Sequence, residues 1–128
     1  MILTNDNTNL GTPGFTKRYR AIKRVKEYIE VCINEDITVR DLCKVSGVSE
    51  RTLQYAFTEY IGMSPKSFMK INRLNHARQE LRNSRESEES IFDIANRWGF
   101  WHMGQFAADY KKLFGELPSE TKRVKWIY

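Results

Sequence analysis

The sequence predicts an all-α fold in which two helix–turn–helix subdomains are joined by a long linker helix. A repeat indicates this architecture, because the segment that begins at Thr38 recurs from Ser90, and Gly47 is matched 52 positions later by Gly99. After one inserted residue the match continues with Leu53 and Phe106, Phe57 and Tyr110, Gly62 and Gly115, and Pro65 and Pro118. Each copy reads as a helix, a glycine turn and a second helix. A long helical pattern separates the copies, and no segment has a convincing strand pattern.

We expect four regions along the chain. Residues 1–15 are rich in Asn, Thr and Gly and are interpreted as a flexible tail or the remnant of an interdomain linker. Residues 16–64 form the first helix–turn–helix subdomain, residues 65–83 the linker helix and residues 84–128 the second subdomain. The tail favours a fragment of a longer protein over a stand-alone short regulator.

The helices of the first subdomain follow from apolar spacing and caps. An apolar stripe, Ile22, Val25 and Ile29, predicts a helix over about residues 16–32. Thr38 with Asp41 predicts an N-cap for the next helix, since a hydroxyl satisfies a free backbone N–H and a carboxylate suits the helix N-terminus. The same cap recurs at Ser90 and Asp93 in the second copy.

The second helix of each copy is expected over about residues 49–60 and 102–114. Their inward positions are Leu53, Phe57 and Ile61 in the first copy, and Phe106, Tyr110 and either Leu113 or Phe114 in the second. The linker helix is expected from Pro65, with Ser64 as its cap, to Asn83. Its length of ~28 Å at 1.5 Å per residue suits two helices held about 34 Å apart, one turn of DNA.

Composition narrows the function classes. The net charge of +5 and pI near 9.3 suit an anionic partner but are a weak signal alone, and no stretch approaches the length of a membrane span. Cys32 and Cys43 fall at helix positions of apolar period and are read as reduced core residues of a cytoplasmic protein. No metal site or cofactor is expected, because the sequence has no CxxC and no Cys/His cluster. No glycine-rich phosphate loop, paired carboxylate or nucleophile with its base indicates an enzyme.

The outward positions of the second helices are the candidate DNA-binding residues. Arg51 suits bidentate binding to guanine and Gln54 to adenine, although both also fit a solvated helix face. The candidates of the first copy are Glu50, Arg51, Gln54, Tyr55 and Thr58. The candidates of the second copy are His102, Met103, Gly104, Gln105, Ala107, Ala108, Lys111 and Lys112. Asp109 also faces outward, and Gly104 allows close approach of the backbone. This second face is less polar, so we expect less base discrimination from it, or more phosphate and methyl contact.

Three other groups of residues allow either a functional or a structural interpretation. The basic run from Lys17 to Lys26, and the basic residues from Lys122 to Lys125, are phosphate candidates or solvated surface. Trp98, Phe100 and Trp101 are expected in or near the core rather than as a base-stacking platform. A helical protein-interaction module remains the main rival to a DNA-binding function.

The motifs resemble the DNA-binding domain of the AraC/XylS family of bacterial transcription regulators over about residues 17–123. The resemblance rests on Gly47-Val48-Ser49, Leu53-Gln54 and Phe57 in the first half, and on Arg73-Leu74, Ala77-Arg78 and Leu81 between the copies. It is most specific at Ile94-Ala95, Gly99-Phe100, Phe106, Tyr110-Lys111-Lys112, Phe114-Gly115 and Pro118-Ser119.

The resemblance implies seven helices, with two motifs that bind successive major-groove segments of double-stranded promoter DNA. It implies a cytoplasmic, nucleoid-associated transcription activator that contacts RNA polymerase and does not bind membranes. It places Arg51, Gln54 and Tyr55, and Met103, Gly104 and Ala107, at base-contacting positions. This chain has Tyr55 where the family often has Arg, and Met103 and Gly104 where polar residues are usual. Most family members carry an N-terminal effector-binding or dimerisation domain.

Overall fold

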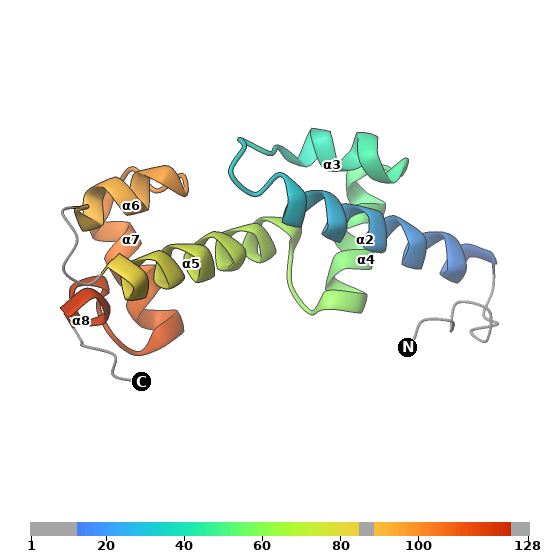
Figure 1. Ribbon diagram of the computed structural model, residues 1–128. Coiled ribbons are helices and arrows are strands. Elements are labelled where there is room, and N and C mark those ends of the chain that lie inside the picture. Colours follow the sequence, from blue (N-terminus) through green and yellow to red (C-terminus); the bar gives the residue numbers. More distant parts are fainter. Residues whose placement is uncertain (1–12, 85–88, 124–128) are drawn as a thin grey trace. The chain divides into compact units, whose positions relative to one another are not determined.

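The computed structural model describes residues 13–84 and 89–123, which contain seven helices and no strand (Figure 1). The predicted all-α class is therefore confirmed. The helices are α2 (Pro13–Val31), α3 (Val39–Ser46), α4 (Glu50–Ile61), α5 (Pro65–Ser84), α6 (Ile91–Arg97), α7 (Met103–Phe114) and α8 (Pro118–Arg123). The chain divides between Met69 and Lys70 into two compact units. None of the helices in the described ranges is long and apolar enough to cross a membrane.

The first unit is built on the apolar stripe of α2. Ile22, Val25 and Ile29 are buried as expected, and α2 packs against both α3 and α4 (Figure 1). Helix α2 starts at Pro13, three residues before the predicted start at Thr16. Proline is favoured at the first helical position, because its missing N–H has no partner there in any case. The rest of the predicted tail, residues 1–12, lies outside the described residues.

The connection from α3 to α4 forms as the caps predict. The Thr38 hydroxyl accepts a hydrogen bond from the Asp41 amide at 3.1 Å, and the Asp41 carboxylate accepts one from the Thr38 amide at 2.9 Å. Gly47 has the left-handed φ of 76° that an L side chain rarely adopts. Sequence analysis missed the buried Ser46, whose hydroxyl donates to the Cys43 carbonyl and accepts from the Val48 amide. Because of these contacts, the turn that aims α4 is braced on both sides of Gly47.

Helix α5 belongs to both units. Its N-terminus is capped as predicted, since the Ser64 hydroxyl accepts from the Ser67 amide at 3.1 Å. The division falls after Met69, so most of this helix, including the buried Leu74, Ala77 and Leu81, lies in the second unit. The predicted subdomain limits at residues 64 and 84 stay predictions.

The second unit repeats the design of the first. The Ser90 hydroxyl accepts from the Asp93 amide at 3.0 Å, and Gly99 has a left-handed φ of 89°. Ile94 and Phe106 are buried where the repeat places Leu42 and Leu53 in the first unit. Helices α6, α7 and α8 pack against one another.

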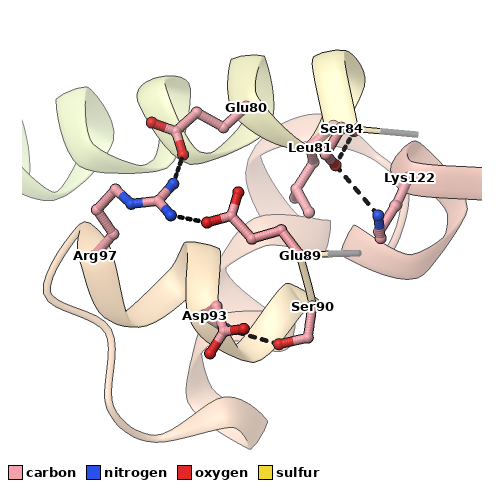
Figure 2. A network of polar contacts seen from close by, with 8 residues as sticks. All are labelled: Glu80, Leu81, Ser84, Glu89, Ser90, Asp93, Arg97 and Lys122. Carbon is pink, nitrogen blue, oxygen red and sulfur yellow. Dashed lines mark hydrogen bonds and ion pairs between the residues drawn. The ribbon is translucent and has the colours of Figure 1, made fainter. Parts of the chain in front are cut away.

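In the second unit, polar side chains connect α6 and α8 to α5 (Figure 2). The Arg97 guanidinium lies between the carboxylates of Glu80 and Glu89 and forms an ion pair with each. On α8, the Lys122 ammonium donates to the Ser84 hydroxyl at 3.3 Å, which in turn donates to the Leu81 carbonyl at 3.0 Å. These contacts tie α6 and α8 to the C-terminal half of α5.

The sequence analysis gave no residue range for helix α8. It packs through Thr121, which is fully buried and accepts a hydrogen bond from the Tyr110 hydroxyl at 2.7 Å. The signal was present, because Pro118 is followed by Glu120, whose carboxylate accepts from the Leu117 amide at 2.7 Å.

Some predicted core positions are exposed or only half-buried, Ile61 of α4 among them. Trp101 is 66% exposed, because it lies in the non-helical segment before α7, where its neighbour Phe100 packs on Phe106 with ring centroids 5.0 Å apart. Leu113 is 41% exposed, and the alternative, Phe114, packs against Tyr110. Cys32 and Cys43 are free thiols, but both are half-buried rather than in the core.

We predict that Gly99→Val lowers the free energy of unfolding by at least about 1–2 kcal/mol, the cost of a left-handed conformation for an L residue. The cause is backbone strain, because an added Cβ meets only ordinary contacts with the Arg73 side chain at 3.9 Å. Urea unfolding followed by circular dichroism measures the change. Gly104→Ala is the matched control, since Gly104 has no left-handed φ and open space at its Cβ. An unchanged unfolding midpoint for Gly99→Val would refute the strained turn.

Candidate nucleic-acid interface

Helix α4 presents one continuous outward face in the first unit. Leu53, Ala56 and Phe57 are buried, and this fixes the rotation of the helix about its axis. The predicted residues Glu50, Arg51, Gln54, Tyr55 and Thr58 come together around one surface hollow of about 690 Å³. Tyr55 is 70% exposed and Gln54 is half-buried. A cation, an amide and a phenol therefore project from the same side of the helix.

A second hollow, of about 550 Å³, adjoins this face on the side of α2. Tyr55 and Thr58 line both hollows, and Arg18 of α2 lines the second one. The Arg18 guanidinium lies 3.7 Å from the Glu59 carboxylate of α4. One member of the predicted basic run, Arg18, therefore sits at the edge of the α4 face. The other basic residues of the run are exposed, and they are Lys17, Arg20, Lys23, Arg24 and Lys26.

Helix α7 presents a face of different chemistry in the second unit. Phe106 and Tyr110 are buried and turn the opposite side of the helix outward. Exposed positions on or beside this helix are His102, Gly104, Gln105, Ala108, Lys111 and Lys112. Met103 and Ala107 are half-buried. The predicted residues of this copy are thus accessible, and few of their side chains form hydrogen bonds.

Two polar side chains on α7 are held by neighbours. The Gln105 amide donates to the Asp109 carboxylate at 2.9 Å, and the Lys70 ammonium donates to its other oxygen at 3.1 Å. Burial raises the pKa of Asp109, but the hydrogen bonds from Lys70 and Gln105 outweigh burial and leave this pKa below its usual value. Asp109 therefore stays ionised at neutral pH. Sequence analysis missed this pairing, because Lys70 and Asp109 are distant in the sequence.

The predicted C-terminal basic residues differ in position. Lys122 is half-buried and contacts Ser84, whereas Arg123 is exposed. Val124 and Lys125 lie outside the described residues. In the described ranges, no group of three His, Cys, Asp or Glu side chains is arranged to hold a metal ion.

The arrangement of each unit, with one helix braced by others and its outer side left open, defines a helix–turn–helix protein. A family model described as a helix-turn-helix domain matches residues 42–123. The chain is 37% identical over 80% of its length to the "Probable thc operon regulatory protein" of Rhodococcus erythropolis, of which it covers 31%. It is 30% identical over 94% of its length to "XylDLEGF operon transcriptional activator 1" of Pseudomonas putida, of which it covers 37%.

A solved structure agrees with this assignment. The structure of a "probable AraC family transcriptional regulator" from Rhodopseudomonas palustris CGA009 matches with a TM-score of 0.77 and 38% identity, over 81% of this chain and 95% of that one. The chain belongs to the AraC/XylS family and carries its DNA-binding domain. This family and fold are those of transcription regulators rather than enzymes. The chain spans about a third of the length of these curated relatives.

We predict that the ion pair on α7 makes stability depend on pH below about 4. The folded pKa of Asp109 is depressed, so the stabilisation is complete above the unfolded pKa of about 3.9 and is lost as the pH falls through the folded pKa. Because the pair is partly exposed, Asp109→Asn should cost less than about 1 kcal/mol at pH 7 and a smaller amount at pH 2. Urea unfolding at both pH values measures this, and an equal cost at both would contradict the assignment.

Proposed function

We propose that this chain is the promoter-reading part of a bacterial transcription activator and inserts α4 and α7 into successive major-groove segments. The observation that carries the proposal is the α4 face, where Arg51, Gln54 and Tyr55 project together from a helix whose other side is buried. An α-helix fits the major groove, and arginine and glutamine match guanine and adenine there by paired hydrogen bonds. The repeat supplies a second helix of the same kind, α7, in the second unit.

The exposed cations are proposed to bind phosphates. Lys111 and Lys112 lie in the last turn of α7, and in the first unit Arg18 of α2 lies beside α4 while the other basic residues of α2 are exposed. Such contacts position a protein on DNA without reading its sequence. The net charge of +5 agrees with binding to an anionic partner.

The relatives suggest further parts of the function. One of them is named an operon transcriptional activator, and the chain covers only about a third of it. We propose that the parent protein carries an N-terminal effector-binding or dimerisation domain and contacts RNA polymerase at the promoter. The protein then acts in the cytoplasm at the nucleoid, where promoter DNA is found.

The first test is selection of bound fragments from a random DNA library, followed by a salt titration on the recovered sequence. We expect the logarithm of the association constant for DNA to fall linearly with the logarithm of the salt concentration, with a slope near −0.9 for each phosphate contacted. The recovered sequence should also outcompete random DNA. A protein-interaction module would enrich no sequence and would show no such salt dependence.

The second test is Arg51→Ala. This substitution should weaken binding to the recovered site by about 1–3 kcal/mol and binding to random DNA far less, because a base contact is lost. Arg40→Ala is the matched control, since Arg40 is an exposed arginine of the same unit on α3 rather than α4. Equal losses on both DNAs for Arg51→Ala would move Arg51 from the bases to the phosphates.

A further inference from the structure

The positions of α7 that the repeat matches to Arg51, Gln54 and Tyr55 of α4 have no hydrogen-bonding side chain. Met103 and Ala107, one turn apart, are half-buried on this helix, and Gly104 and Ala108 are exposed beside them. The corresponding turns of α4 carry Arg51, Gln54 and Tyr55. The two helices therefore cannot read base pairs by the same chemistry.

The polar side chains beside these positions on α7 are already paired with one another or with α5. Gln105 donates to Asp109, and Asp109 also accepts from Lys70, so these side chains hold each other against the α5 side of the helix. On the other side, the apolar surface continues from Met103 and Ala107 to Phe92 and Leu117, around a hollow of about 310 Å³. Phe92 is 53% exposed. The outward side of α7 is thus bordered by an apolar hollow and by paired polar groups.

Gly104 leaves the backbone of α7 open to solvent. It has no left-handed φ, and a Cβ placed on it would meet nothing within 4 Å. The fold therefore does not require glycine here, although glycine weakens a helix by roughly 1 kcal/mol relative to alanine. The space above Gly104 lies outside the protein. We attribute the missing side chain to close approach of a bound molecule to the helix backbone.

We propose that the second unit recognises thymine, through contact of Met103, Gly104, Ala107 and Ala108 with its 5-methyl group. This inference rests on the proposed DNA-binding function. Among the four bases, only thymine presents an apolar group in the major groove, so only thymine gains from a face that offers methyl and methylene groups. One half of the site is then selected by hydrogen bonds to α4 and the other half by methyl contacts to α7.

The experiment uses the duplex recovered from the random DNA library. Thymine is replaced by deoxyuridine, which keeps every base-pair hydrogen bond and lacks only the methyl group, in one half-site at a time. The half-site read by α4 is identified as the one in which Arg51→Ala weakens the preference for the selected base. We expect uracil in the other half to weaken binding about threefold to tenfold, and uracil in the α4 half to change it less than about twofold.

Two variants assign the effect to α7. Met103→Gln keeps a similar volume and adds a polar group, so it should reduce the difference between thymine and uracil. Arg51→Ala should keep that difference and is the matched control. Gly104→Ala should weaken binding to the recovered duplex while its thermal melting temperature stays equal to or above that of the parent.

The outcomes separate this inference from the function on which it rests. Failure to recover any sequence from the library refutes DNA reading itself. A recovered sequence that lacks thymine in the α7 half, or that tolerates uracil there, overturns methyl recognition and leaves the DNA-binding function intact. A thymine preference of unchanged size in Met103→Gln overturns the assignment to this face.

Discussion

The burial of one stripe on the second helix of each motif is the constraint on which this molecule depends. Leu53 and Phe57 on α4, and Phe106 and Tyr110 on α7, are almost completely removed from solvent. Each such side chain contributes about 1.5–3 kcal/mol when it is fully buried. Because a helix turns through 3.6 residues, fixing this stripe also fixes which residues face outward. The candidate reading faces are thus a consequence of the core.

Helix caps and turn glycines place the helices so that these side chains are buried. Hydroxyl caps at Thr38 and Ser90 set where α3 and α6 begin, and glycines with left-handed backbones let the chain reverse after each of them. Ser46 braces the first turn through two hydrogen bonds, whereas its counterpart in the repeat, Trp98, is buried and stacks on His76 at 4.5 Å between ring centroids. Two copies of one motif therefore keep their geometry with different side chains.

Much of the fold could be predicted because its signals are local. Caps, turn glycines and apolar periods depend on neighbours within a few residues, and the helices α4, α5 and α7 begin and end within about two residues of the expected limits. The exposure of Trp101 could not be predicted, because it depends on how Phe100 packs on Phe106. The pairing of Lys70 with Asp109, and of Arg97 with Glu80, depends likewise on elements brought together by the tertiary fold. The outward faces were predictable from helical period, but the engagement of Gln105 and Asp109 was not.

The two motifs have diverged in chemistry while they share one scaffold. On α4 the outward residues carry charge and hydrogen-bonding groups, and the matching positions of α7 carry the small residues Gly104, Ala107 and Ala108. If both helices read DNA, the DNA site bound by one chain is asymmetric, and its two halves are recognised through different physical interactions. Such an arrangement lets a single chain define the direction in which it lies on a promoter.

The most direct test of the central claim is methylation-protection footprinting of the complex with the sequence recovered from the random DNA library. This method reports which guanine N7 atoms are covered in the major groove, so a guanine is placed in each half of the site at a position that the library selection leaves free. The account predicts two protected major-groove segments on one face of the duplex, about 10 base pairs apart from centre to centre. Protection of one segment only, or of two segments on opposite faces, would contradict insertion of both helices.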